Sequence, residues 1–275
     1  KIFETKNRPE FNPLIIHFSS FDQVEENCEI NDDIKKLSDL FWPGPMTVIL
    51  KKKKESKISE LASASLDTVG VRIPSNTTAL KLIKSFGKPI AAPSANTSSS
   101  LSPTEADHVF EYFKNDKNLS IILDGGSTKI GLESTIINIT NGEIHILRHG
   151  GISAEELKEK FPQNIINIEQ KTNEKIIAPG MLSKHYSPVV PLRINAKKAE
   201  KNELLIGFGP SYNAPNLSFE GNLVEAASNL FSFLAKYQKK YSKIAIAPIP
   251  NKGIGRAIND RIKRATSKNQ AVGNS

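Results

Sequence analysis

Four basic residues stand at positions where their charge could bind an anionic ligand. Lys6 and Arg8 are two residues apart, while Arg72 and Arg148 each lie in an apolar stretch of the chain. Ammonium groups neutralise phosphate, and a guanidinium can hold two oxygens of a phosphate or a carboxylate at once. An arginine in an apolar strand is costly unless it has a partner or lies in a cleft. These residues indicate a candidate anion site, although each one alone also fits a surface charge or a structural ion pair.

Polar residues at the ends of apolar segments could complete such a site. Ser94 and Asn96 follow a proline and begin a hydroxyl-rich loop, residues 94–100, and His17 ends an apolar run. Hydroxyl and amide groups can hydrogen-bond phosphate or ribose, but such a loop is also typical of a flexible linker. A lone histidine is more often a packed or surface residue than a catalyst.

The sequence excludes several common types of site. One cysteine, Cys28, and five scattered histidines do not form a zinc pattern. The chain has neither a Walker A sequence nor the glycine fingerprint of dinucleotide-binding domains. Any nucleotide site in this chain must therefore be of a different type.

The overall charge favours a phosphate-rich partner. The 275 residues carry a net charge of +8, and the sequence pI is about 9.3. A basic balance is typical of proteins that bind nucleotides or RNA. The alternative is a solvated surface, and we expect the lysine run 51–54 to lie in a solvated turn because blocks of like charge usually face water.

The composition is that of a globular protein without cross-links. Apolar residues make up 38% of the chain and charged residues 24%. The single cysteine excludes a disulfide within the chain and fits a cytoplasmic location. We find no apolar run long enough to span a membrane and no secretory signal at the front. The chain begins at Lys1 without Met or a helix cap, as if within a helix, so we expect residues to be missing before it.

Strands and helices in mixed order would position the candidate residues. A proline-led apolar run predicts a strand over residues 12–18, and Asn141-Gly142 predicts a hairpin between residues 134–139 and 144–148. Because strands and helices do not alternate strictly, we expect a mixed sheet. Further strands or extended segments are predicted over residues 46–50, 68–74, 88–93 and 121–126. Helices are predicted over residues 32–41 and 77–86, after Ser102 as N-cap, and from residue 153.

A second module follows a segment with little regular pattern. A strand over residues 204–208, a helix over 223–237, a strand over 244–247 and a helix from about residue 255 predict a small parallel α/β domain of Rossmann-like type. We therefore expect three parts. They are a first domain over residues 1–161, a linker over 162–191 and a C-terminal domain over 192–275.

An ordered series of motifs runs along the chain. It comprises Lys6-Asn7-Arg8, Asn12-Pro13-Leu14-Ile15-Ile16-His17, Trp42-Pro43-Gly44-Pro45-Met46-Thr47, Val71-Arg72-Ile73-Pro74, Ala92-Pro93-Ser94-Ala95-Asn96 and Ser134-Thr135. This series resembles the YrdC-like domain of threonylcarbamoyl-adenylate synthases. Two later segments resemble the linker and the C-terminal helix of the two-domain members of that family. They are Ala178-Pro179-Gly180-Met181 with Lys184-His185-Tyr186-Ser187-Pro188, and the stretch from Gly253 to Arg261.

The resemblance covers nearly the whole chain and implies both a fold and an activity. The family fold is a twisted mixed α/β sheet domain, followed in long members by a Rossmann-like domain. The implied reaction joins L-threonine and bicarbonate into a carbamate, adenylates it with ATP and Mg²⁺, and releases pyrophosphate. A separate complex then transfers the threonylcarbamoyl group to tRNA, so contact with tRNA or other RNA is a further expectation.

The resemblance also implies roles for individual residues. Tyr186 is the linker residue expected to close over ATP, Asn96 is expected to help hold the metal, and no general base is identified. The ATP contacts implied are Lys6, Arg8, Asn12, Thr68, Ser94, Ser102, Arg148 and Tyr186, and the threonine contacts are His17, Arg72, Ala92 and Ser134. One departure is that the family's upstream Pro-Thr-x-Thr-x-Tyr-Gly-Leu stretch has no counterpart in this chain.

Three other interpretations are open at this point. A basic face could bind RNA without catalysis, and binding would then depend steeply on salt and not on threonine. A carbamoyl transfer of the hydrogenase-maturation type is disfavoured, because those chains need cysteine pairs for zinc. An inactive regulatory fragment would follow if the upstream stretch were truly absent.

Overall fold

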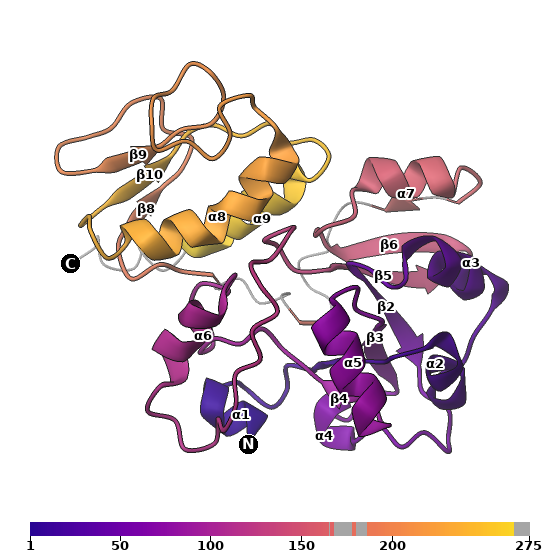
Figure 1. Cartoon of the computed structure of the whole chain (residues 1–275). Helices are drawn as coiled ribbons and strands as arrows, with labels where there is room; N and C mark the ends of the chain where they lie inside the picture. The colour runs from indigo at the N-terminus through magenta and orange to yellow at the C-terminus, as the bar shows by residue number, and fades with distance from the viewer. Residues whose placement is uncertain (165, 168–177, 180–185, 267–275) are drawn as a thin grey trace. The chain divides into compact units, whose positions relative to one another are not determined.

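The computed structural model of the chain describes residues 1–164, 166–167, 178–179 and 186–266 (Figure 1). These residues form two compact units, which we describe separately. The large-sheet unit contains the described residues of 8–93 and 133–179, and the small-sheet unit contains residues 1–7, 94–132 and 186–266. No helix among these residues is long and apolar enough to cross a bilayer.

The large-sheet unit is built on a seven-stranded mixed sheet with the strand order β4-β1-β3-β2-β5-β6-β7. Strand β1 runs parallel to β3, β3 antiparallel to β2, β2 parallel to β5, and β5 antiparallel to β6. The predicted mixed sheet is therefore confirmed. Its strands are β1 (Ile15–His17), β2 (Met46–Lys51), β3 (Thr68–Arg72), β4 (Ile90–Ala91), β5 (Thr135–Thr140), β6 (Glu143–Arg148) and β7 (Ile166–Asn167).

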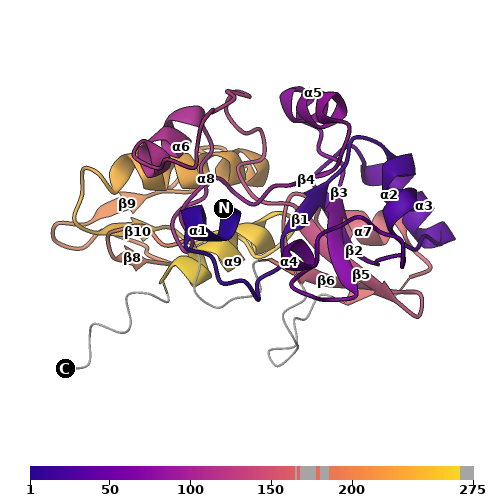
Figure 2. The ribbon, with the colours of Figure 1, turned by 90° about the horizontal axis from the view of Figure 1, so that it is seen from below.

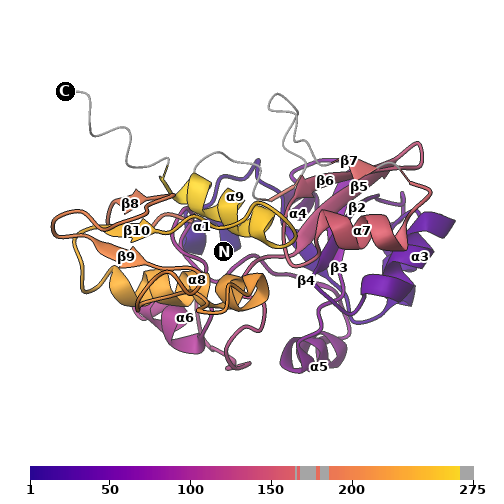
Figure 3. The ribbon, with the colours of Figure 1, turned by 90° about the horizontal axis from the view of Figure 1, so that it is seen from above.

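Strand side chains alternate between the two faces of this sheet, and helices cover one of these faces. Val48, Val71 and Ile137 pack with Leu37 and Leu157 from the helices into the main core of the unit. Figures 1 and 3 show α3 and α7 beside the sheet. The helices of this unit are α2 (Phe21–Asn27), α3 (Asp32–Phe41), α4 (Glu60–Ser63), α5 (Thr77–Phe86) and α7 (Ala154–Lys160).

The opposite face of the sheet carries a separate, smaller apolar cluster. Ile15, Ile49, Ile136 and Leu147 lie in it. Each of them neighbours in sequence a residue of the helix-covered face, as the two-residue period of a strand requires. Thr47 precedes Ile49 by two residues on β2 and therefore belongs to this second face.

Local signals in the sequence explain where these elements begin and turn. The side-chain oxygens of Asn31 and Asn76 accept hydrogen bonds from the third residues of α3 and α5 at 2.9 and 3.0 Å, as N-caps do. In the β5–β6 hairpin, Asn141 and Gly142 both have positive φ, 53° and 77°. That geometry is the reason for the Asn-Gly preference in two-residue hairpin turns.

The small-sheet unit contains a three-stranded parallel sheet in the order β8-β10-β9. Figures 2 and 3 show β10 between the other two strands. The predicted parallel α/β arrangement is confirmed, with the helix over residues 223–237 at its predicted bounds. The elements of this unit are α1 (Ile2–Lys6), α6 (Ala106–Phe113), β8 (Leu192–Arg193), β9 (Leu204–Ile206), α8 (Leu223–Tyr237), β10 (Ile244–Ile246) and α9 (Gly255–Thr266).

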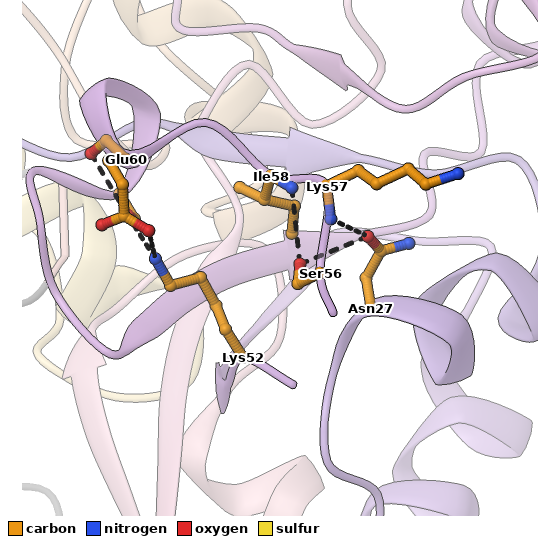
Figure 4. A network of polar contacts seen from close by, with 7 residues as sticks. Asn27, Lys52, Ser56, Lys57, Ile58 and Glu60 are labelled. Carbon is orange, nitrogen blue, oxygen red and sulfur yellow. Dashed lines mark hydrogen bonds and ion pairs between the residues drawn. The ribbon is translucent and has the colours of Figure 1, made fainter. Parts of the chain in front are cut away.

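The lysine run 51–54 is not a purely solvated turn. Figure 4 shows Lys52 directed at Glu60, with its ammonium 2.8 Å from the carboxylate, and the same group donates to Ser63 Oγ at 3.0 Å. Ser56 Oγ donates to Asn27 Oδ1 at 3.3 Å in the same view. Lys51 ends β2, and the residues after it are tied to α2 and α4. The prediction of a solvated turn is therefore wrong for Lys51 and Lys52.

Two other predictions on local structure are wrong. Helix α6 begins at Ala106 with Glu105 as its N-cap position, so Ser102 does not cap it. Residues 121–126 form no strand, and Ile121 and Leu123 are 73% and 55% exposed. A segment with strand propensity does not form a strand without a partner to complete its hydrogen bonds. Four residues of the linker motif, Gly180, Met181, Lys184 and His185, lie outside the described residues.

Candidate functional site

Sheet topology brings several predicted residues to one edge of the seven-stranded sheet. His17 and Arg72 end the parallel strands β1 and β3, and Thr47 lies at the start of β2, which runs the opposite way. Ser134 immediately precedes β5, which is parallel to β2, and Arg148 ends the antiparallel strand β6. Five strand ends thus meet at one edge, which we call the arginine edge after its two guanidinium groups.

Arg72 is a partly buried cation that lacks an acidic partner among the described residues. Its Nε donates to the Gly44 carbonyl at 2.9 Å, and no ion pair joins it to a carboxylate within the described parts of the chain. Burial, and then the positive charge of Arg148, lower the pKa of Arg72 to about 10. The group remains charged near neutral pH. Arg72 is therefore suited to bind an anion, which would offset both the desolvation of its charge and the repulsion from Arg148.

The Gly44 carbonyl that holds Arg72 depends on a tight turn after α3. The Gly44 amide donates to the Ile73 carbonyl at 2.9 Å. A Cβ at this position would lie 2.2 Å from the Phe41 carbonyl oxygen, so only glycine fits without a shift of the backbone. The glycine of the Trp-Pro-Gly-Pro segment thus places the acceptor that orients Arg72.

Arg148 is held by main-chain oxygens and by Ser134. Its Nε and Nη2 donate to the Ser134 carbonyl at 3.1 and 3.0 Å, and Nη1 donates to the Pro179 carbonyl at 3.3 Å. Nη2 also donates to Ser134 Oγ at 3.0 Å. Both residues are buried, at 4% and 2% exposure. The guanidinium therefore fixes the position of the Ser134 side chain.

Thr47 sets the direction in which the Ser134 hydroxyl donates. Thr47 is fully buried, and its hydroxyl lies 2.7 Å from Ser134 Oγ, its one partner among the described residues. A buried hydroxyl rarely leaves its hydrogen unused, so Thr47 donates to Ser134. Ser134 Oγ then accepts from Thr47 and Arg148 together, which leaves its own hydrogen for an acceptor atom of a ligand.

His17 stands beside Arg72 in the register of β1 and β3. Burial, and then the positive charge of Arg72, lower the pKa of His17 to about 3, so the imidazole is neutral near pH 7. Its buried Nδ1 has no hydrogen-bond partner among the described residues. A neutral ring with an unpaired nitrogen can exchange a hydrogen bond with a ligand without adding charge.

Arg8 and Asn12 form a second polar group in the same unit. The Arg8 guanidinium donates to the carbonyls of Asn12 and Pro13 at 3.1 and 2.7 Å, and so holds the loop that leads into β1. The Asn12 side chain is 3% exposed, and its Oδ1 has no partner among the described residues. A buried acceptor without a donor is a position where a ligand could bind.

Lys6, Ser94 and Asn96 meet in the small-sheet unit. The Lys6 ammonium donates to the carbonyls of Ser94, at 2.5 Å, and of Asn96, and it lies 3.3 Å from Asn96 Oδ1. Ser94 Oγ donates to the same Oδ1 at 2.6 Å, and Asn96 Nδ2 donates to the Ser100 carbonyl at 3.0 Å. The loop predicted from its hydroxyl groups is thus organised around a buried lysine.

This cluster does not fit a metal ion held by the protein. Mg²⁺ is usually bound by carboxylates and phosphates, whereas Asn96 Oδ1 already accepts from a hydroxyl and lies beside an ammonium. Among the described residues, no group of three or more His, Cys, Asp or Glu side chains is placed to hold a metal.

Four predicted contacts remain, and each is described within its own unit. Thr68 begins β3, four residues or about 13 Å along the strand from Arg72. Ala92 is exposed and donates its amide to the Ile15 carbonyl, toward the start of β1. In the small-sheet unit Ser102 is 8% exposed, and Tyr186 is buried with its ring 5.7 Å from that of Phe231.

Two positioning groups of the arginine edge were not predicted as site residues, namely Thr47 and the Gly44 carbonyl. A threonine inside the apolar run Met46 to Leu50 is the signal that could have identified the first, because a buried hydroxyl needs a partner. The carbonyl had no signal beyond the glycine itself, since its role depends on how β2 and β3 pair.

Two family models match the chain. The model described as "Telomere recombination" matches residues 1–150, and the model described as "Threonylcarbamoyl-AMP synthase, C-terminal domain" matches residues 152–267. Together they account for nearly all of the sequence.

Relatives and a solved structure agree with these matches. The chain is 37% identical to the threonylcarbamoyl-AMP synthase of Pyrococcus abyssi, over 97% of this chain and 83% of the relative. It is 34% identical to that of Bacillus subtilis, over 96% and 82%. The crystal structure of Pyrococcus abyssi Sua5 complexed with L-threonine matches with a TM-score of 0.85 at 36% identity, covering 96% of this chain and 83% of that one.

Proposed function

Because this chain belongs to the threonylcarbamoyl-AMP synthase family, we propose that it makes threonylcarbamoyl-AMP from ATP, L-threonine and bicarbonate and releases pyrophosphate. One observation carries the proposal. Arg72 is a partly buried guanidinium without an acidic partner among the described residues, fixed by a main-chain oxygen beside neutral and hydroxyl groups. Such a group favours a small carboxylate over a bulky polyanion.

The arginine edge would bind L-threonine. Arg72 would hold the carboxylate with its terminal nitrogens, since its Nε is already committed to Gly44. Ser134 would donate its hydroxyl hydrogen to a threonine oxygen, and neutral His17 would make a hydrogen bond without adding charge. Ala92, also proposed as a threonine contact, could do so only through backbone or methyl atoms.

The proposed ATP contacts divide by charge. Lys6, Arg8 and Arg148 would neutralise phosphate oxygens, which need cations as the α-phosphorus is attacked. Polar and aromatic residues would contact the rest of the nucleotide or close over it. They are Asn12, Thr68, Ser94, Ser102 and Tyr186.

The proposed chemistry relies more on the positioning of the substrates than on covalent catalysis by side chains. The threonine amine and bicarbonate combine into a carbamate with loss of water. A carbamate oxygen then attacks the α-phosphorus of ATP, and the bond to pyrophosphate breaks. Mg²⁺ would arrive with ATP and supply further charge neutralisation. His17 is too weak a base near neutral pH to take protons efficiently, and we assign no general base.

The threonylcarbamoyl-AMP product would leave this enzyme and serve as the substrate of a later step. A mixed anhydride of a carbamate and AMP is reactive, so we propose that a separate transfer complex consumes it and modifies tRNA. The enzyme would then act in the cytoplasm, where that RNA is found.

Pyrophosphate release tests this proposal. We expect release from Mg·ATP and bicarbonate to require L-threonine, and to fall at least 100-fold in Arg72→Ala. Lys84→Ala, which removes an exposed charge in the same unit, serves as the matched control and should behave as the unmodified protein. Release that is independent of threonine, or equal in Arg72→Ala and the control, would overturn the assignment.

A further inference from the structure

The net positive charge of the chain is concentrated in one segment. Residues 186–266 contain 13 lysines and arginines against five aspartates and glutamates, whereas the rest of the chain contains 24 of each. The basic balance of the protein is therefore a property of this segment of the small-sheet unit. If the lysines served only to keep the surface solvated, the positive charge would not need to be concentrated in one segment.

Four of these lysines lie at one end of the parallel sheet. The first residues of β9 and β10, Leu204 and Ile244, are partners in the register, so the segments just before them are neighbours. The Leu204 amide donates to the Lys243 carbonyl at 3.0 Å, and Ser242 Oγ donates to the Asn202 carbonyl at 3.4 Å. The turn after α8 leads directly into this place. We call Lys201, Lys239, Lys240 and Lys243 the lysine edge.

The lysine edge forms no ion pair with any described residue. All four side chains are exposed, and none pairs with a carboxylate within the described part of the chain. The neighbouring carboxylates of Glu200 and Glu203 pair with Arg193, at 3.5 and 2.5 Å, and Lys243 acts on Glu203 through its charge without forming an ion pair. Further exposed lysines, Lys197, Lys198 and Lys236, add to the positive charge on the same segments.

Aromatic rings accompany the charge. Phe233, Tyr237 and Tyr241 form an edge-to-face series with ring centroids 5.8 and 6.1 Å apart. The last ring of the series, Tyr241, is 41% exposed and lies between Lys240 and Lys243 in the chain. An exposed ring among exposed lysines is typical of surfaces that bind nucleic acid, since the ring can stack on a base and the lysines can bind phosphates.

We infer that the lysine edge is a binding surface for RNA, with phosphates on the four lysines and an unstacked base on Tyr241. The inference rests on the proposed function only for the choice of tRNA as the probe. It places the RNA contact on the segment that holds the charge, rather than on the large-sheet unit, whose described residues contain 15 basic and 16 acidic groups.

The test compares two variants that lose the same charge. One carries glutamine at all four positions of the lysine edge, and the control carries Lys54→Gln, Lys57→Gln, Lys84→Gln and Lys88→Gln, four exposed lysines of the large-sheet unit. Binding of an unmodified tRNA transcript is followed by fluorescence anisotropy at several salt concentrations. We expect the lysine-edge variant to bind at least ten-fold more weakly at 150 mM salt, with a salt slope smaller by about three. The dissociation constant of the control for tRNA should lie within two-fold of that of the unmodified protein.

Other outcomes would overturn the inference. Equal losses of tRNA affinity in both variants would mean that binding needs only positive charge anywhere on the surface. An unchanged salt slope in the lysine-edge variant would mean that the lysine edge contacts no phosphate. Binding to phosphatidylserine vesicles with no binding to tRNA would assign the edge to a membrane surface. Pyrophosphate release is measured on the same samples. Its absence in every sample would count against the proposed function alone, whereas its persistence in the lysine-edge variant shows that the variant is folded.

Discussion

Arg72 and Arg148, at the edge of the seven-stranded sheet, are held by main-chain oxygens, whereas the four lysines beside β9 and β10 are exposed and form no ion pair within the described chain. The first arrangement fixes the direction of each guanidinium donor and removes it partly from water. The second leaves each ammonium free to move and strongly hydrated. Fixed, desolvated cations select a small anion by geometry, while many mobile ones attract a polyanion by number. The comparison teaches that net charge alone would have pointed to the second region and missed the first.

The largest expected effect comes from changing the geometry of the arginine edge without changing its charge. Arg72→Lys keeps the cation but loses the Nε donor to Gly44 and the planar fork. We expect kcat/KM for L-threonine in pyrophosphate release to fall about 100-fold, or about 2.7 kcal/mol. A fall of less than three-fold would mean that charge suffices there, and the contrast between the two regions would not hold.

A smaller effect is expected when a positioning hydroxyl is removed. Thr47→Val should raise KM for L-threonine about five-fold with little change in kcat, because one hydrogen bond of about 1 kcal/mol orients Ser134. Thr47→Ser should restore most of the loss.

Thr135→Val is the matched control for that variant. Thr135 is equally buried, and its hydroxyl donates to the Ile152 carbonyl at 2.6 Å instead of to a site residue. The control should lower the melting temperature without raising KM. An equal rise in KM in the two valine variants would show that Thr47 is merely structural.

The buried histidine should make stability depend on pH. The pKa of His17 is about 3 in the folded chain, below its ordinary value of 6.5, so the unfolded chain takes up a proton first as the pH falls. The free energy of unfolding should therefore decrease between pH 6.5 and 3, by about 1 kcal/mol per pH unit, and be unaffected above 6.5. Urea unfolding of His17→Asn should give a shallower dependence than the unmodified protein, and an identical dependence would contradict the burial.

The smallest expected effect concerns salt. Raising KCl from 50 to 200 mM should change KM for L-threonine less than three-fold, because partly buried charges are screened weakly. The same change should weaken tRNA binding at the lysine edge by more than ten-fold. Parallel losses in the two assays would mean that both regions act as solvent-exposed charge.

Local signals predicted most of the elements that build the two regions. Asn31 marks the start of the helix that the structure has at residue 32, and Asn141-Gly142 forms the expected hairpin. The failures have a common cause. Ser102 and the segment 121–126 carried local signals for a cap and a strand, yet the surrounding chain provides neither a helix at that position nor a partner strand.

The candidate site could be predicted only as separate residues. The residue type of Arg72 suggested anion binding, and the resemblance added His17 and Ser134 and suggested which anion. That five strand ends meet at one edge depends on the strand order, which no local pattern contains. The direction of the Ser134 hydroxyl depends in turn on Thr47, and it could be derived only once β2 and β5 were paired.

Calorimetric titration of L-threonine tests the central claim most directly, because it measures binding at the arginine edge without the later steps. The unmodified protein and the lysine-edge variant should bind L-threonine with the same affinity, while Arg72→Ala, shown to be folded by circular dichroism, should show no measurable binding. Undiminished binding by Arg72→Ala, or its loss in the lysine-edge variant, would contradict the assignment of threonine to the arginine edge.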